Sequence, residues 1–479
     1  MSASNLLIIM SDEHQARAMG CAGHPFVQTP HLDALAARGT RFTDAYTPCS
    51  ICVPARASFA TGRYVHQTRL WDNAMPYDGS IPGWGHGLQA AGVPVESIGK
   101  LHYRSEEDPA GFDVEHIPMM VAGGVGMVWA SIRKEDERVI GEGRMLGDYI
   151  GPGDSKYTDY DRAVTKRTAE WLENRAASDD DRPWCLYVGL VAPHFPLVVP
   201  RQYYDLYPLD RLPDVKLHPE NGHARHPWVE KQNAMNDSDA KFADAQERLR
   251  AIASYFGLCS WLDHNVGEIL SALEASGMMD DTTIVYTSDH GDNVGARGLW
   301  GKSNLYLESV AVPMIMAGPA IPVGTCNTPV SLIDLSQTIA AHFGTGIHGA
   351  DGIRSLKTIA AEEHDLNRPI FSEYHAAGAV SGAFMLKKGR WKFHYYVGFP
   401  SELFDLETDP EETRNLADDP AHAGTLALME DALREICDPE ATDERAFADQ
   451  AALIERVGGR EAALKLGAAG ATPAPQVTS

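Results

Sequence analysis

Two cysteines, a proline and an arginine lie close together in the stretch CSICVPARASFATGRY, residues 49–64, and these residue types can carry out nucleophilic chemistry. Cys49 and Cys52 are three positions apart, so the spacing permits a redox pair, half of a metal site, or one nucleophile beside an inert thiol. A redox pair needs a thioredoxin-like unit around it, and a structural zinc site needs two further Cys or His close by. The sequence supplies neither near these residues.

Cys52 is better interpreted as a single nucleophile at the start of a helix. The Cys-to-Arg spacing of cysteine-dependent phosphatases is not met, because Arg56 follows Cys52 by four positions and Cys49 by seven. Pro54 is favoured in a first helical turn, and Gly62 is typical of a helix end. Helix N-termini attract anions through their free N–H groups and their dipole. The pattern therefore predicts attack by residue 52 on an anionic ester, with Arg56 one turn further on.

Three apolar stretches that predict buried strands each end in ionisable residues. They are residues 6–10 before Asp12, residues 184–191 before His194, and residues 283–287 before Asp289 and His290. Continuous apolar runs of this kind are typical of strands buried on both faces of a parallel sheet. Sites in open α/β sheets form beyond the carboxyl ends of the strands. We therefore expect these ionisable side chains to meet at one edge of the sheet.

Helical patterns alternate with these strands, and the character of the chain changes after about residue 350. Residues 29–39 predict a short helix with Thr29 as its N-cap, and residues 240–275 predict a long one. The later part predicts two strands and a polar helix, over residues 389–396, 401–406 and 421–436. We therefore expect an α/β domain over residues 1–350, followed over residues 351–479 by a smaller α+β subdomain whose tail, from Gly467, is mobile or forms an interface.

Composition narrows the classes of partner and compartment. The chain has 479 residues, is 44% hydrophobic and carries a formal net charge of −25, which disfavours nucleic acid and anionic membranes as partners. The first apolar run, Leu6 to Met10, is too short for a signal peptide or a membrane span. Seven scattered cysteines do not indicate a secreted disulfide framework. These features predict a cytoplasmic protein without membrane contact.

Several ordered motifs resemble those of the type I sulfatases, a family within the alkaline phosphatase superfamily. The first is Cys52-Val53-Pro54-Ala55-Arg56 with Thr61-Gly62-Arg63, which is similar to the family signature C-x-P-x-R. The others span about residues 5 to 420 and are Thr29 to Ala36 with Gly39, Gly99-Lys100-Leu101-His102, Ser288-Asp289-His290-Gly291, and Glu402 to Leu406 with Asp409-Pro410 and Asn415-Leu416. The resemblance implies an alkaline-phosphatase-like fold: a large mixed, mostly parallel sheet flanked by helices.

The resemblance also implies a nucleophile and a metal site. In the family, a maturation enzyme oxidises the signature cysteine to formylglycine, whose hydrate attacks sulfur and forms a covalent sulfo-enzyme hemiacetal. The implied metal ligands here are Asp12, the modified Cys52, Asp289 and His290, holding Ca²⁺, Mg²⁺ or Mn²⁺. The sequence departs from the common family pattern, because Glu13 replaces a second aspartate and His290 replaces an asparagine. The resemblance leaves open whether Glu13 contacts the metal.

The remaining implied site residues are cationic or polar. Arg56 is expected to orient the diol, Lys100 and Lys302 to hold sulfate oxygens, and His102 to assist collapse of the hemiacetal. His194, in APHFP, is expected at the leaving oxygen, and Asn73, in WDN, at the anion, as in phosphonate monoester hydrolases. The aromatic side chains that could line the substrate pocket are Trp71, Trp129, Tyr374 and His375.

Three functions remain open at this point. The leading expectation is hydrolysis of a small sulfate ester by a homo-oligomer, a dimer or tetramer. The alternative is a phosphonate monoester or phosphodiester hydrolase with the same nucleophile, which Asp289-His290 favours and the Gly-Lys-x-His motif disfavours. A non-catalytic binding protein would result if Cys52 stayed unmodified. The motifs do not identify the alcohol or phenol that leaves.

Overall fold

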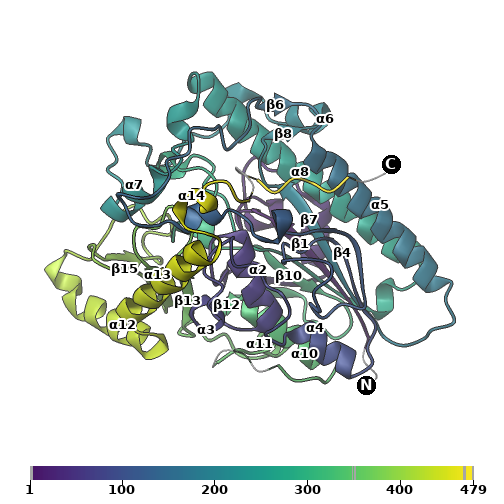
Figure 1. Ribbon diagram of the computed structural model, residues 1–479. Coiled ribbons are helices and arrows are strands. Elements are labelled where there is room, and N and C mark those ends of the chain that lie inside the picture. The colour runs from purple at the N-terminus through teal and green to yellow at the C-terminus, as the bar shows by residue number, and fades with distance from the viewer. Residues whose placement is uncertain (1–3, 348, 350–351, 468–470, 477–479) are drawn as a thin grey trace.

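The main feature of the fold is an eight-stranded sheet in the order β11-β2-β10-β9-β1-β7-β4-β5 (Figure 1). The structure is a computed structural model and describes all residues except 1–3, 348, 350–351, 468–470 and 477–479. Neighbouring strands run parallel except where β10 pairs with β9 and with β2, which confirms the predicted mixed, mostly parallel sheet. The strands of this sheet are β1 (Asn5–Asp12), β2 (Gly39–Phe42), β4 (Val95–Lys100), β5 (Val114–Met119), β7 (Cys185–Pro193), β9 (Thr282–Ser288), β10 (Met314–Ala317) and β11 (Gly324–Cys326).

Both faces of the central strand β1 are covered, which explains its unbroken apolar sequence. Leu7 and Ile9 face a core shared with the helices α1 (Pro30–Ala37), α5 (Lys156–Ala176) and α8 (Ala245–Ala275). Leu6 and Ile8 face a second core on the other side, shared with α2 (Cys52–Thr61), α4 (Trp84–Ala90) and α10 (Leu332–His342). The successive side chains of a strand point to opposite faces, so a strand sandwiched in this way has no polar face.

The helix α1 begins at Pro30 with Thr29 in the N-cap position, as expected, but the long helix α8 begins later than expected. The long helix α8 begins at Ala245 and not at residue 240, because the Asp244 carboxylate caps it by accepting from the Glu247 backbone N–H (2.8 Å). Thr29 makes no capping bond to α1. Instead Asp263 of α8 accepts from the backbone N–H of Leu32 (2.8 Å), so the cap comes from a distant element. The sequence interpretation also missed α5, whose apolar positions are interspersed with many charged residues.

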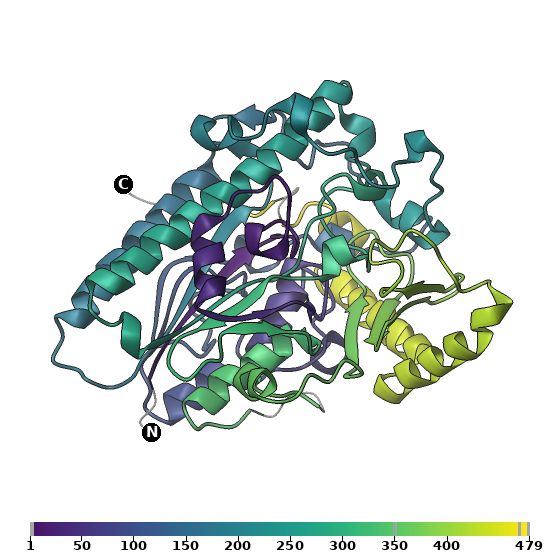
Figure 2. The same ribbon diagram turned by 180° about the vertical axis from the view of Figure 1, so that it is seen from behind.

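The C-terminal part contains a separate four-stranded antiparallel sheet, in the order β13-β14-β15-β16 (Figure 2). Its strands are β13 (Ile370–Tyr374), β14 (Ala383–Lys388), β15 (Trp391–Tyr396) and β16 (Glu402–Asp405), and the helices beside it are α12 (Ala423–Ile436) and α13 (Pro439–Arg456). The predicted strand over 389–396 begins only at Trp391, because Gly389 has a φ of 62° and forms the hairpin turn with Arg390. The predicted domain boundary at 350/351 lies outside the described residues.

The fold also contains shorter strands and α-helices. They are β3 (Ala45–Tyr46), β6 (Gly151–Pro152), β8 (Val198–Val199), β12 (Val330–Ser331), α3 (Val65–Thr68), α6 (Arg201–Tyr204), α7 (Pro227–Asn233), α9 (Leu307–Val310), α11 (Leu356–Ala361) and α14 (Arg460–Ala463). Within the part of the chain that the structure describes, no helix combines the length and apolarity needed to cross a membrane. In the tail, within residues 471–476, Thr472 forms hydrogen bonds with His102 and Tyr157 of the main domain.

Candidate active site

Three strand ends meet at one edge of the large sheet, as the sequence predicts. β1 lies between β7 and β9, so Asp12 at its end is beside Pro193 of β7 and close to the end of β9. Asp289 follows β9 directly, and His194 follows β7 directly. All three side chains are buried. The parallel arrangement of the strands therefore gathers ionisable groups from sequence positions nearly 280 residues apart.

Four donor atoms at this edge lie within 4.8 Å of one another: one atom each from Asp12, Cys52, Asp289 and His290. The Nε2 atom of His290 is 3.6 Å from Asp289 Oδ1 and 3.9 Å from Asp12 Oδ1. The other ring nitrogen, Nδ1, lies 3.1 Å from the Gly291 carbonyl oxygen. Since a carbonyl only accepts, Nδ1 carries the proton in a neutral ring, and the lone pair on Nε2 points to the carboxylates. This donor set suits a divalent cation.

Cys52 is the first residue of α2, at the N-terminus that the sequence predicts. Its Sγ lies 3.2 Å from His290 Nε2 and 3.7 Å from Asp12 Oδ1. Burial and then the charge of Asp12 raise the pKa of the Cys52 thiol to about 12. The protein groups alone therefore keep this thiol protonated. Cys49 is also buried, and burial raises its pKa as well, but its side chain is not part of the four-atom cluster.

Arg56 forms hydrogen bonds with both carboxylates of this cluster. Its Nε donates to Asp289 Oδ2 (2.8 Å), and its Nη2 donates to Asp12 Oδ2 (3.1 Å). Its Nη1 donates to the hydroxyl oxygen of Tyr187 (2.9 Å), a residue of β7. Each carboxylate thus presents one oxygen to Arg56 and the other toward Cys52 and His290. The guanidinium is buried, and although burial alone would lower its pKa, Asp289 raises it well above the usual value.

Two lysines from other parts of the chain also reach the site. The Nζ of Lys100, at the end of β4, is 2.6 Å from Asp12 Oδ2. Burial would raise the pKa of Asp12, but Lys100 and then His194 lower it well below its usual value. Lys302 Nζ lies 2.7 Å from Glu13 Oε2. Glu13 thus pairs with Lys302 and lies outside the four-atom cluster, but it forms a second group that could hold a metal ion with Asp12 and His194, and its Oε1 is buried without a partner among the described residues.

The predicted histidines and Asn73 line a small pocket above Cys52. His194 Nε2 is 3.4 Å from Glu13 Oε2, and its Nδ1 donates to the Phe195 carbonyl oxygen (2.6 Å). Burial and then Lys302 lower the pKa of His194 well below its usual value. Burial and then Lys100 do the same for His102, whose Nδ1 has no partner among the residues that the structure places. The pocket has a volume of about 120 Å³ and is lined, among others, by Cys52, Asn73, Lys100, His102, His194 and Lys302.

The apolar lining of the pocket agrees only in part with the sequence prediction. Trp129 lines it, together with Met127, Met145, Phe195 and Met235. Trp71 and Tyr374, also predicted as candidates, instead belong to a buried core cluster, and His375 packs edge-on against Trp71. The pocket therefore has one of its predicted aromatic residues, and methionines, Phe195 and smaller apolar residues such as Val53 and Val121 form other parts of its apolar wall.

Sequence reasoning missed three residues that contact the site. Tyr187 binds Arg56 from the middle of an apolar strand, where nothing in the sequence distinguishes it from a core tyrosine. Tyr157 lies at the start of α5, with its ring centroid 5.8 Å from that of His194. Thr472 belongs to the tail, and its Oγ1 is 2.7 Å from His102 Nε2. No spacing rule connects these residues to the motifs.

Comparisons with known proteins agree with this geometry. Residues 4–345 match the family described as "Sulfatase", and residues 295–438 match the one described as "N-sulphoglucosamine sulphohydrolase, C-terminal". The chain is 34% identical to a choline-sulfatase of Rhizobium meliloti (strain 1021), covering 93% of this chain and 89% of that protein. It is 28% identical to arylsulfatase K of Danio rerio, covering 86% and 80% respectively.

A solved structure supports the fold. The phosphonate monoester hydrolase of Agrobacterium radiobacter superposes with a TM-score of 0.74 at 22% identity, covering 90% of this chain and 95% of that one. The family match covers well over half of the chain, and the choline-sulfatase similarity extends over nearly all of it. The chain therefore belongs to the sulfatase family and is a sulfuric ester hydrolase.

Proposed function

We propose that the chain hydrolyses small sulfate esters with a nucleophile made by oxidation of Cys52 to formylglycine. The observation that supports this most is the position of Cys52 Sγ, at the start of α2 and within one cluster with Asp12, Asp289 and His290. The atom marks the position that a formylglycine oxygen would take. As a thiol with a pKa of about 12, Cys52 is a poor nucleophile. It also lacks the two hydroxyls of a formylglycine hydrate, of which the second serves to expel sulfate.

The donor set fits a divalent metal ion. Two carboxylates, an imidazole and residue 52 converge, while Arg56 binds the outer oxygens of both carboxylates. In this arrangement Asp12, Asp289, His290 and residue 52 would hold the ion. When bound, it would supply a Lewis acid that acidifies a hydroxyl at residue 52 near neutral pH.

Cationic side chains around the pocket would bind the sulfate group. Among the described residues that line it, the lysines are Lys100 and Lys302, and neither Asp nor Glu is present. Asn73 accepts a hydrogen bond from the Val53 N–H (3.3 Å) through its Oδ1, which leaves its amide N–H groups to donate to an anion. Preorganised donors of this kind stabilise the charge that develops on the transferred group.

His194 and Lys302 would act on the oxygen that leaves. Both line the pocket, and Lys302 is positioned by Glu13, so the two side chains approach the ester from the same side. His194 Nδ1 donates to the Phe195 carbonyl oxygen, so Nε2 is the ring atom left for the substrate, and it must take up a proton before it can donate to the leaving oxygen. A donor at the leaving oxygen matters most when the alcohol is a weak acid.

Peptide mass spectrometry combined with turnover tests the proposal. We expect the peptide that carries both cysteines to show an aldehyde at residue 52 and a thiol at residue 49 after coexpression with a formylglycine-generating enzyme. We also expect turnover of phenyl sulfate or choline sulfate, lost with a chelator and restored by Ca²⁺, Mg²⁺ or Mn²⁺, with a higher Tm in the matching ion. An unmodified Cys52 in active protein would contradict the proposed nucleophile, and inactive protein with the aldehyde would contradict the substrate class.

Phosphonate monoester or phosphodiester hydrolysis is a second candidate, favoured by His290. The imidazole lies within the donor cluster, where many sulfatases have an asparagine, and the Agrobacterium phosphonate monoester hydrolase shares the fold. A rate comparison on phenyl sulfate and a phenyl phosphonate monoester, made with the same preparation, decides between the two. Equal or faster turnover of the phosphonate would favour this second function.

A further inference from the structure

Residues 471–476 of the tail lie against the active site, far in sequence from the catalytic motifs. Ala471 and Thr472 line the pocket above Cys52, and Ala471 and Ala474 pack against the main core cluster. In Figure 1 the yellow C-terminal segment runs from α14 across the ends of the central strands toward α5. The tail therefore covers the catalytic edge of the same chain.

Thr472 connects this segment to two parts of the catalytic machinery. Its Oγ1 is 2.7 Å from His102 Nε2, and its carbonyl oxygen accepts from the Tyr157 hydroxyl (2.5 Å). The Tyr157 ring in turn packs edge-on against the His194 ring. Both bonds are at least partly buried, so they compete little with water. The tail thus fixes one ring nitrogen of His102, while the other has no partner among the described residues.

The tail also leaves little room for a leaving group. With Ala471 and Thr472 as lining residues, the pocket encloses about 120 Å³. Pockets for drug-sized ligands hold about 300–1,000 Å³, and an engineered cavity of about 150 Å³ holds one benzene. The wall also includes large side chains, among them Met127, Trp129 and Phe195, and small residues, among them Gly126, Ser303 and Ala377. Removing the Thr472 side chain would therefore enlarge the pocket on the side of the tail.

We propose that the tail is a wall of the substrate pocket and that Thr472 determines specificity, by limiting the leaving group to about the size of one ring or a short chain. The inference rests on the proposed sulfate ester hydrolysis and adds a size limit to it. Thr472 is also a positioning residue, because its hydroxyl holds His102. Tyr157 supports the wall by holding the Thr472 carbonyl oxygen.

Substitutions in the full-length chain separate the two roles. Thr472→Gly removes both the side chain and the hydroxyl, whereas Thr472→Ser keeps the hydroxyl. We expect Thr472→Gly to raise the ratio of kcat/KM for 2-naphthyl sulfate over phenyl sulfate by about 10-fold or more. It should also lower kcat for phenyl sulfate by about 2- to 10-fold, the equivalent of one hydrogen bond, and Thr472→Ser should restore kcat. Tyr157→Phe should change the ratio in the same direction with a smaller effect.

Thr425→Val, on α12, is the control, because Thr425 lines a different cavity. A ratio in Thr472→Gly that stays within about twofold of the wild-type value would overturn the proposal, provided that the variant keeps the wild-type Tm.

If no sulfate ester is turned over, the proposed function has failed. The size limit is then tested by calorimetric binding of both sulfates to Cys52→Ala with and without Thr472→Gly. Equal relative affinities in that comparison would overturn the size limit independently.

Discussion

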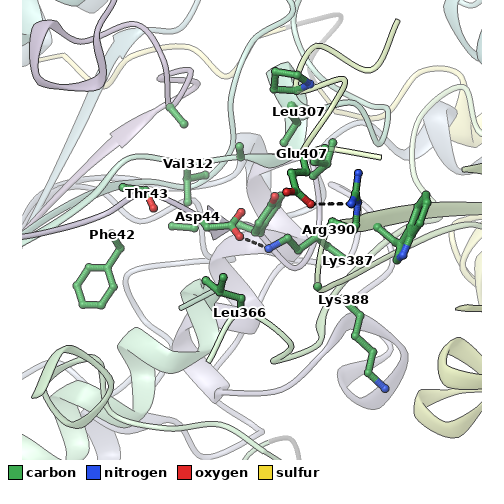
Figure 3. A pocket seen from close by; sticks show the side chains of 18 of the residues that line it. Phe42, Thr43, Asp44, Leu307, Val312, Leu366, Lys387, Lys388, Arg390 and Glu407 are labelled. Carbon is green, nitrogen blue, oxygen red and sulfur yellow. Dashed lines mark hydrogen bonds and ion pairs between the residues drawn. The ribbon is translucent and has the colours of Figure 1, made fainter. Parts of the chain in front are cut away.

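The active-site pocket and the groove shown in Figure 3 differ in size and in the state of their charges. The groove, between β3 and the β14–β15 hairpin, has a volume of about 1100 Å³, roughly ninefold that of the active-site pocket. Its ion pairs join Lys387 to Asp44 and Arg390 to Glu407, and the Glu407 side chain is 67% exposed. In the active site, Arg56, Lys100 and their carboxylate partner Asp12 are all buried.

A cluster of several buried charges therefore marks the chemistry here, whereas cavity size and single buried ion pairs such as Lys392–Glu412 do not. Exposed ion pairs contribute about 0–1 kcal/mol and cost little, so they occur wherever a surface carries both signs. Burying an ion cluster removes the hydration of its charges, and their mutual attraction compensates for this loss only in good geometry. Such clusters therefore add little to stability. A cluster of buried carboxylates, guanidinium and lysines at the end of a central strand is therefore better explained by the reaction than by the fold. The following experiments test this difference between the two regions.

The largest effect is expected from Cys52→Ala. Removing the proposed nucleophile should lower kcat by about 10⁴- to 10⁶-fold, because the remaining groups can bind the ester but not attack it. Cys49→Ala is the matched control, since that thiol is also buried and lies three residues earlier in the sequence, before the helix begins. Kinetics on phenyl sulfate measure both. Retained activity in Cys52→Ala, or loss of activity in Cys49→Ala with the fold intact, would contradict the assignment.

A pair of lysine substitutions compares the two regions directly. Lys100 and Lys387 are both buried and both paired with an aspartate, but only Lys100 lines the active-site pocket. Lys100→Met should lower kcat/KM by about 10²- to 10³-fold, the usual cost of losing one preorganised charge at the transferred group. Lys387→Met should leave kcat/KM unchanged. Similar losses in both variants would show that buried lysines act through stability alone.

His194→Gln should produce an intermediate effect that depends on the substrate. With an alkyl sulfate, whose alcohol is a poor leaving group, we expect kcat to fall by about 10²-fold, the low end for general acid catalysis. With 4-nitrophenyl sulfate the loss should be much smaller, because the leaving phenolate needs little stabilisation. A Brønsted plot of rate against the pKa of the leaving group measures the difference. An unchanged slope would remove His194 from the leaving-group step.

The smallest effect is expected at the edge of the groove, from Asp405→Asn. The hydrogen bond from Arg390 lowers the pKa of Asp405 to about 2 in the folded protein, below the usual value of about 3.9 in an unfolded chain. The wild-type advantage in the free energy of unfolding should therefore be complete above about pH 5 and disappear as the pH falls toward 2. Because Arg390 is partly exposed, we expect at most about 1 kcal/mol, measured by urea unfolding. Activity at neutral pH should not change.

Local patterns predicted much of the fold and the site. The apolar runs of β1, β7 and β9 identified three strands of the parallel sheet, because strands buried on both faces have no polar alternation that could be confused with a surface element. The long helix α5 was missed, since its mean hydropathy is low and its core stripe is diluted by charges. The cap of α1 by Asp263 was missed because the partner lies more than 230 residues away.

The sequence by itself predicted the nucleophile, the metal-ligand candidates and the cationic residues, mostly through short motifs that resemble those of the sulfatase family. Only the tertiary structure decided how they combine: Glu13 pairs with Lys302, the two inward carboxylate oxygens face His290, and Tyr187 supports Arg56. The tail's contact with His102 also emerged only from the structure. These are contacts between distant segments, and their selection depends on packing and burial, which no local pattern of residues encodes.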